Sequence, residues 1–207
     1  MKKEKVIVIE PVAVNYATIK IVGDTDLVLN KMNDRMAWEL GPGRDAPKGT
    51  RRANVWEDII TSMHWRDEKP TDFSEEGLKK ALIENAPCIT AFGLKKSFNN
   101  SVVRNEIDKY ATKFDAAVNV LGTAGLVPIK FTEHFIDEKL MSPQKGRPVL
   151  CKLNRFTGWS AEFTISYVDK AFSLEQILEI IKLAGFGIGI GSGRTSGYGR
   201  YHIEAIK

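Results

Sequence analysis

The segment GFGIGIGSGRTSGYGRY near the end of the chain combines glycine with arginine, two residue types suited to holding phosphate. Glycine lets a phosphodiester approach backbone N–H groups closely, because no Cβ atom stands in the way. Arginine adds positive charge and a planar group that donates two parallel hydrogen bonds to a phosphate. The residue types therefore make seven residues of this segment candidates for contact with a phosphate group: Gly189, Gly191, Gly193, Arg194, Gly197, Gly199 and Arg200.

Two common phosphate-binding motifs do not fit this segment. The P-loop needs a lysine where Arg194 stands and a glycine where Ile188 stands. The dinucleotide motif G-x-G-x-x-G needs a third glycine, and Arg194 occupies that position after Gly189 and Gly191. Both motifs also follow a strand and open a helix, whereas this segment follows a predicted helix and opens a predicted strand. The structural alternative is a flexible crossover, or a place where glycine allows close packing against another element.

Two further basic segments are predicted to contact the same strand of nucleic acid. The segment KLMSPQKGRPVLCKLNR has five basic residues and no acidic one, and GPGRDAPKGTRR reads as a loop. The candidate contacts are Lys145, Arg147, Lys152 and Arg155 in the first segment, with Arg51 and Arg52 in the second. A solvated face is the alternative explanation of such charge. Phe156, Trp159 and Tyr201 lie near the basic residues in sequence, and they either stack on bases or belong to the core.

Hydrophobic periodicity predicts the elements that must position these residues. Alternation indicates strands at residues 17–22, 126–131, 159–168 and 199–206, and helical periodicity indicates helices at 93–110 and 173–185. The order strand, helix, strand, strand, helix, strand is that of the split βαβ arrangement. We therefore predict an α+β, ferredoxin-like (RRM-like) βαββαβ core with inserted basic loops and a C-terminal glycine-rich loop. Residues 1–207 form a single domain in this interpretation, with insertions at approximately 41–90 and 133–155.

Composition limits the class of protein and its surroundings. The chain has 207 residues and a formal net charge of +4, which permits a polyanionic partner. Cys88 and Cys151 lie far apart, so the sequence predicts neither a disulfide framework nor a zinc site. The apolar run at the N-terminus is broken by Glu10 and Pro11, and nothing approaches the roughly 20 apolar residues of a membrane span. We expect a cytoplasmic protein with no cofactor, no metal and no membrane partner.

The glycine-rich segment resembles the C-terminal loop of the RAMP superfamily, the ferredoxin-like RNA-binding proteins of CRISPR systems typified by the Cas5, Cas6 and Cas7 families. Gly189, Gly191, Gly197 and Gly199 match the glycines of that pattern, and the predicted helix before it and strand after it are in the expected order. The opening segment IKIVGDTDLVLNKM is similar to the start of RAMP-like proteins that bacteriophages encode. The resemblance to Cas7-like proteins implies a homo-oligomer or filament along a strand.

Members of the families that the chain resembles differ in whether they cleave RNA. Cleaving members of the Cas6 family use a histidine in the first helical region, and the matching segment LVLNKMNDRM has none. The three histidines are His64, His134 and His202, and none has a titratable partner at motif spacing. FTEHFIDE places acidic residues around His134, but it lacks the helical H-E-x-x-H geometry of a zinc site.

The sequence thus favours non-catalytic binding of single-stranded DNA or RNA through the glycine-rich loop and the basic insertion, as an oligomer. Two alternatives stay open. One is a Cas6-like, metal-independent RNA endonuclease. The other is a phage-encoded sponge or inhibitor that binds a nucleotide or a host defence protein.

Overall fold

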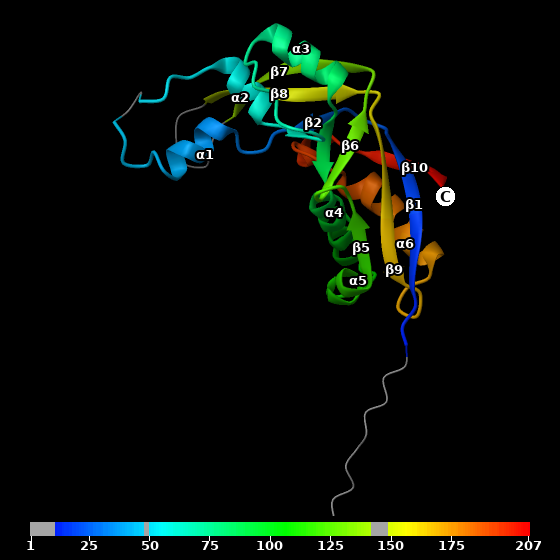
Figure 1. The fold of residues 1–207 in the computed structure, drawn as a ribbon. Helices are drawn as coiled ribbons and strands as arrows, with labels where there is room; N and C mark the ends of the chain where they lie inside the picture. Colours follow the sequence, from blue (N-terminus) through cyan, green and yellow to red (C-terminus); the bar gives the residue numbers. More distant parts are fainter. Residues whose placement is uncertain (1–10, 48–49, 142–148) are drawn as a thin grey trace, which may run out of the picture.

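The computed structural model describes residues 11–47, 50–141 and 149–207, without the side chains of 140, 141 and 149 (Figure 1). Lys48, Lys145 and Arg147 lie outside the described residues. The larger sheet has seven strands within the described chain. Its strands are β1 (Val14–Gly23), β3 (His64–Trp65), β4 (Pro87–Thr90), β5 (Val118–Leu121), β6 (Leu126–Lys130), β9 (Ser160–Val168) and β10 (Tyr201–Ile206).

The central strands of this sheet follow the order that the sequence predicts. The path is β10-β1-β9-β6-β4-β3, and β5 also pairs with β9. All the paired strands are antiparallel. Along the chain, β1, β6, β9 and β10 alternate with α4 (Ala91–Arg104) and α6 (Leu174–Leu183), so β1 and β9 lie at the centre of a split βαβ arrangement. The predicted α+β class is confirmed.

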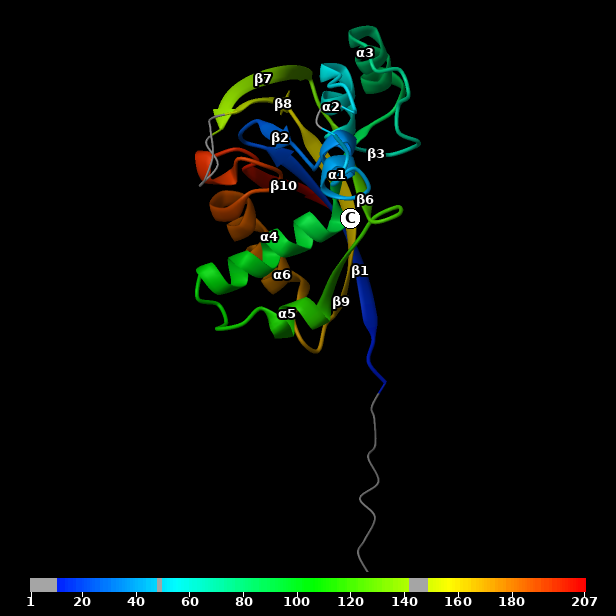
Figure 2. The ribbon, with the colours of Figure 1, turned by 90° about the vertical axis from the view of Figure 1, so that its left-hand side faces the viewer.

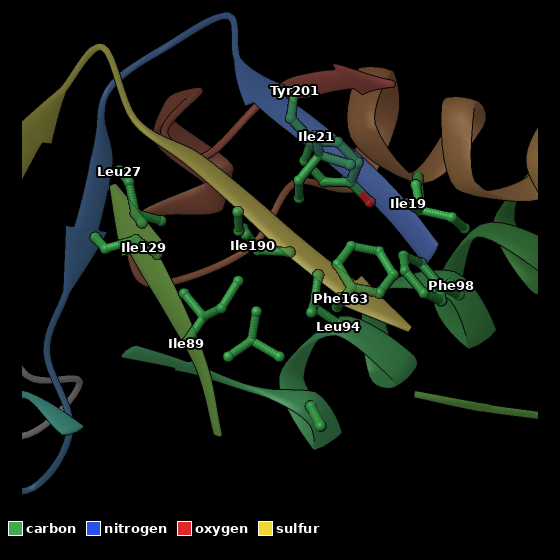
Figure 3. Close-up of a cluster of buried hydrophobic side chains, with 14 of the residues drawn as sticks. Ile19, Ile21, Leu27, Ile89, Leu94, Phe98, Ile129, Phe163, Ile190 and Tyr201 are labelled. Atoms are coloured by element: carbon green, nitrogen blue, oxygen red, sulfur yellow. The ribbon is translucent and has the colours of Figure 1, made fainter. Parts of the chain in front are cut away.

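Helices α4 and α6, with the shorter α5 (Thr112–Ala117), lie against one face of the sheet (Figures 1 and 2). The alternation of β1 turns Ile19 and Ile21 toward these helices, and both side chains are fully buried. Phe98 of α4 packs on Phe163 of β9 with ring centroids 6.1 Å apart (Figure 3). The core therefore lies between this sheet face and the helices.

The start of α6 shows how strongly the local sequence specifies these elements. The Ser173 hydroxyl accepts a hydrogen bond from the Gln176 amide, and the Gln176 side chain accepts one from the Ser173 amide. This capping box satisfies two amides that the first helical turn leaves without partners. Ile177, Ile180 and Ile181 then form the buried stripe.

The segment predicted as an inserted basic loop at approximately 133–155 is not a loop over its described residues. It forms two paired strands, β7 (Glu133–Met141) and β8 (Val149–Thr157), and β2 (Leu27–Leu29) extends them into a second, three-stranded sheet. Weak apolar alternation in EHFIDEKLM hid β7. The fully buried Phe156 is the residue that ties β8 to the core.

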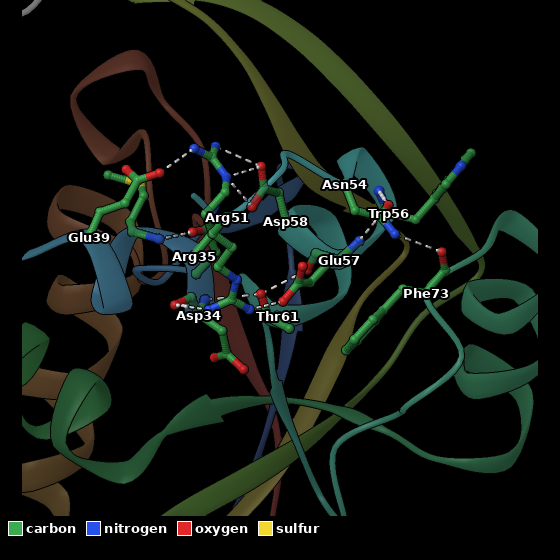
Figure 4. Close-up of polar contacts among 12 residues, drawn as sticks. Asp34, Arg35, Glu39, Arg51, Asn54, Trp56, Glu57, Asp58, Thr61 and Phe73 are labelled. Atoms are coloured by element: carbon green, nitrogen blue, oxygen red, sulfur yellow. Dashed lines mark hydrogen bonds and ion pairs between the residues drawn. The ribbon is translucent and has the colours of Figure 1, made fainter. Parts of the chain in front are cut away.

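The segment predicted to be an insertion, 41–90, contains short helices that lie beside the second sheet (Figure 1). The helices of this region and the one just before it are α1 (Asp34–Leu40), α2 (Val55–Thr61) and α3 (Glu75–Glu84). Arg35 of α1 binds Asp58 of α2, with Nη2 and Oδ2 2.8 Å apart (Figure 4). Asn54 caps α2 by accepting hydrogen bonds from the amides of Trp56 and Glu57. Charged and capping side chains thus fix the path of the chain between β2 and β4.

Candidate nucleic-acid interface

The glycine-rich segment begins where α6 ends. A π-helical turn, Ala184–Ile188, continues α6, and a 3-10 turn, Arg194–Ser196, follows it before β10. Five glycines have φ between 70° and 87°, a backbone conformation that other residues rarely adopt: Gly189, Gly191, Gly193, Gly197 and Gly199. The segment is therefore an ordered structure that needs glycine at these positions.

Close packing explains three of these glycines. A Cβ atom on Gly199 would lie 2.0 Å from the Ile190 carbonyl oxygen, and one on Gly189 would lie 2.8 Å from the Gly199 carbonyl oxygen. A Cβ atom on Gly191 would lie 2.6 Å from the carbonyl oxygen of Val28 in β2. At Gly197 a Cβ atom would meet nothing within 4 Å. Close packing, the structural alternative to phosphate binding, thus explains Gly189, Gly191 and Gly199. It does not explain Gly197, where phosphate binding stays a prediction.

Hydrogen bonds hold the segment to the turn between β1 and β2. The Gly199 amide donates to the Asp26 carbonyl at 2.8 Å, and the Ser192 amide donates to the Val28 carbonyl at 2.8 Å. The Thr25 hydroxyl donates to the Gly197 carbonyl at 2.8 Å. On α4, the buried Ser97 hydroxyl donates to the Gly189 carbonyl at 2.8 Å. The segment is therefore fixed between β2 and α4 (Figure 2).

A cavity of about 210 Å³ opens between this segment, the end of β2 and the start of α4. It is the larger of the two cavities that Arg194 lines, and we call it the larger cavity. Its basic residues are Lys31, Lys96 and Arg194, with His64 beside them. Apolar side chains that include Leu29, Ile89, Leu94 and Ile190 form the rest of its wall. Burial lowers the pKa of the Lys31 ammonium. Burial also lowers the pKa of the His64 imidazole, and the charge of Lys31 adds to this effect.

The backbone adds donors at the same place. Ser196 donates the first hydrogen bond of the 3-10 turn, to the Gly193 carbonyl at 2.8 Å. The amides of Gly193, Arg194 and Thr195 precede that bond, so the turn itself gives them no acceptor. Within the described residues, no carboxylate lies within 4.0 Å of the side-chain nitrogens of Lys31, Lys96 or Arg194. The larger cavity therefore has positive charge that no acidic side chain of the described chain neutralises at close range.

Among the described residues, the other basic residues predicted in the two insertions do not line this cavity. Lys152 binds Glu138 at 2.8 Å across the β7–β8 pair. Arg155 lies 3.5 Å from Asp26 and 3.7 Å from Asp137. Arg51 binds Glu57, and Arg52 is exposed in the loop before α2. Carboxylates thus compete for three of these four cations. Arg200 lines a second cavity, which Arg194 also lines.

The aromatic candidates belong to the core. Phe156 and Trp159 have no exposed surface, and Tyr201 is 1% exposed. The open face of the larger sheet carries mixed charge, with ion pairs between Lys20 and Glu204 and between Lys207 and Glu162. Among the described residues, base stacking on these three rings is therefore excluded in this conformation.

Lys31 and Lys96 were missed by the sequence reasoning. Lys96 lies three residues after Gly93 and two after Leu94 on α4, so the predicted helix already fixed its direction relative to the buried stripe. The sequence gives no signal for Lys31, because its place depends on the turn after β2. Only the packed structure brings β2, α4 and the glycine-rich segment together.

Metal and membrane sites find no support in the described part of the chain. No group of three or more His, Cys, Asp or Glu side chains there is arranged to hold a metal ion. His134 instead lies 2.9 Å from Asn154, measured from Nε2 to Oδ1. None of the described helices is long and apolar enough to cross a bilayer.

Comparison with known protein families gives the relationship. The model of the RAMP superfamily matches residues 67–202, which include α4, β9, α6 and the glycine-rich segment. The chain belongs to the RAMP superfamily. The predicted resemblance is therefore confirmed over most of the chain.

Two solved structures are similar to this RAMP protein at low sequence identity. One is the crystal structure of Cmr6 from Pyrococcus furiosus, with 11% identity, a TM-score of 0.44, and coverage of 93% of this chain and 98% of that one. The other is a chain in the cryo-EM structure of the Type III-B Cmr-beta bound to cognate target RNA, with 14% identity and a TM-score of 0.46. The match covers 94% of this chain and 60% of that one. No curated protein matches the sequence.

Proposed function

We propose that this RAMP protein binds single-stranded nucleic acid in the larger cavity, with the glycine-rich segment as one wall. The observation that carries the proposal is the convergence of Lys31, Lys96 and Arg194 on one cavity with no carboxylate of the described residues within 4.0 Å. Phosphate groups of a strand supply the missing negative charge and displace counterions. The amides at the start of the 3-10 turn add donors beside Arg194.

The lining of the cavity favours a single strand over a duplex. Leu29, Ile89 and Ile190 give it an apolar wall beside the basic residues. An unpaired base presents a face and edges that such a wall can contact, whereas bases in a duplex are stacked inside it. At about 210 Å³ the cavity is smaller than the roughly 300–1,000 Å³ of pockets for drug-sized ligands. It therefore suits one base or one phosphate group of a longer strand rather than a separate, enclosed ligand.

The proposal also includes the predicted roles of the glycines and of the basic residues outside the larger cavity. Gly193 and Gly197 are proposed to let the backbone approach a phosphate, while Gly189, Gly191 and Gly199 serve packing and, as proposed, shape the segment that borders the strand. Lys152, Arg155, Arg51 and Arg52, with Lys145 and Arg147, are proposed as outer contacts of the strand. Assembly with other copies in a Cas7-like, multi-subunit arrangement and a cytoplasmic location stay predictions, as does a phage origin.

A binding assay tests the proposal directly. Labelled single- and double-stranded RNA and DNA are titrated with the protein over a range of salt concentrations. We expect single strands to bind more tightly, and Lys96→Gln to flatten the plot of log affinity against log salt by about 0.7 for the lost contact. Lys80→Gln is the matched control, because Lys80 is an exposed lysine on α3. An unchanged slope in Lys96→Gln, or absence of binding by the wild type, would contradict the proposal.

The endonuclease alternative is favoured by one observation, the presence of His64 in the wall of the larger cavity. Because burial lowers the pKa of His64, its imidazole is neutral near pH 7 and is able to accept a proton. Metal-independent RNA cleavage that His64→Ala abolishes would establish this activity. Intact RNA after prolonged incubation with the wild type would leave binding without catalysis as the function.

A further inference from the structure

Arg194 also lines a second cavity. It has a volume of about 120 Å³, and we call it the smaller cavity. Three arginines line it: Arg104 at the end of α4, Arg194 in the 3-10 turn, and Arg200 just before β10. Asn100, one turn before Arg104 on α4, adds an amide. No ion pair with a carboxylate involves any of these arginines among the described residues.

Arg200 shows that the smaller cavity is short of an acceptor. Its Nη2 donates to the Arg194 carbonyl at 3.3 Å, but its Nη1 is buried and has no hydrogen-bond partner in the described structure. A buried guanidinium nitrogen without an acceptor is costly, and nearly all buried polar groups in proteins are paired. Two other guanidinium groups at the same cavity increase the cost of leaving the charge unbalanced. An anion in the smaller cavity offsets the positive charge of the three arginines and reduces the repulsion among them.

Size and charge indicate which anion fits. The volume of about 120 Å³ is well below the roughly 300–1,000 Å³ of pockets that hold whole small ligands, so it suits a group the size of one phosphate. A phosphodiester within a strand carries one negative charge and continues as a sugar on both sides. A terminal phosphate carries a charge of about −1.5 to −2 at pH 7, has three free oxygens, and continues on one side only. Three converging arginines in a small recess suit the terminal phosphate better on both counts.

We propose that the smaller cavity binds the terminal phosphate of a nucleic-acid strand, so that the protein recognises a strand end. The proposal rests on the proposed function, because Arg194 lines both cavities and places the phosphate next to the strand in the larger one. Lys96, Asn100 and Arg104 recur every four residues along α4, so the helix presents them in one row from the larger cavity to the smaller.

Three short single-stranded RNAs of one sequence test the proposal: one with a 5′-phosphate, one with a 3′-phosphate, and one with hydroxyl groups at both ends. We expect the wild type to bind one of the two phosphorylated RNAs about tenfold more tightly than the hydroxyl-ended RNA. Arg104→Gln removes that preference and keeps most of the affinity for the hydroxyl-ended RNA. Because Arg104 is exposed, this variant avoids the folding defect that Arg200→Gln risks. Lys96→Gln is the matched variant on the same helix, and it weakens all three RNAs alike.

Two results separate this proposal from the proposed function. If the wild type binds all three RNAs equally, strand binding stands and recognition of the strand end is wrong. If it binds no RNA, the proposed function fails. The anion site is then tested alone, by measuring the melting temperature with and without inorganic phosphate. A rise in Tm with phosphate that Arg104→Gln abolishes then supports an anion site in the smaller cavity. No rise overturns it.

Discussion

At the scale of single residues, the cations of this protein fall into two groups. Lys152, Arg155 and Arg51 lie in ion pairs, whereas Lys96 and Arg194 have no carboxylate of the described residues within 4.0 Å. Exposed ion pairs contribute little to stability, but they do reduce the charge available to a phosphate. The residue types alone therefore predicted basic contacts without telling which cations are available. Arg194, which the sequence predicts as a nucleic-acid contact, lines both basic cavities, while Lys31 and Lys96 required the folded structure.

His134 gives a prediction at the same scale. Burial lowers the pKa of its imidazole, and the hydrogen bond to Asn154 only partly opposes this effect. The folded state therefore disfavours the protonated form, so stability is fully present above the unfolded pKa of about 6.5 and is lost as pH falls through the lower folded pKa. We expect the free energy of unfolding to decrease between pH 7 and pH 5, by at most about 1.4 kcal/mol per pH unit for each histidine.

Urea denaturation at several pH values measures this change. His64 has its pKa lowered in the same direction, so it contributes to the wild-type slope. His134→Gln retains a polar side chain that can bond to Asn154, and it should make the dependence on pH shallower. A slope equal to that of the wild type would show that His134 is not the group that titrates.

At the scale of elements, the glycine-rich segment provides the clearest test of why its glycines are there. Gly199→Ala places a Cβ atom 2.0 Å from the Ile190 carbonyl oxygen, so the backbone has to move. Gly197→Ala has free space around the new Cβ, and its cost is the positive φ of 87°, roughly 1 kcal/mol. We expect Gly199→Ala to lower Tm much more than Gly197→Ala does. Thermal unfolding of the two variants beside the wild type is the measurement, and equal losses would contradict the packing explanation.

The elements that the sequence predicted are those with strong local signals. The helix at 173–185 has a capping box and an isoleucine stripe, and β1 alternates clearly between buried and exposed residues. β5 and β7 were missed for different reasons. β5 has only four residues, and in β7 charged residues stand between the apolar ones. β5 pairs with β9, which is distant in sequence, and β7 pairs with β8, the next strand along the chain. Strand formation depends on such partners, and the local sequence pattern does not identify them.

At the scale of the whole molecule, one buried cluster joins the βαββαβ core to the inserted segments. It includes Ile19 of β1, Ile60 of α2, Leu78 of α3 and Phe156 of β8. This continuity supports our proposal that the chain forms one domain with insertions at approximately 41–90 and 133–155. Polar contacts add to the connection where the second sheet meets α2.

Asn154 is the buried polar residue at that junction, and it gives the last prediction. Its amide nitrogen donates to the Ile59 carbonyl and to the Ser62 hydroxyl, both at 3.0 Å, and its oxygen faces His134. Asn154→Ala removes these hydrogen bonds in a fully buried place and leaves the Ile59 carbonyl only its bond from the Ser62 hydroxyl at 2.8 Å, so we expect a loss of about 2–4 kcal/mol in the free energy of unfolding. Lys152→Ala, on the same strand but exposed, should cost about 0.5 kcal/mol or less. Urea denaturation measures both changes, and limited proteolysis should cut Asn154→Ala faster because β8 loses its attachment to α2. Similar losses in the two variants would mean that apolar packing around Phe156, rather than the Asn154 contacts, holds the second sheet to the rest of the molecule.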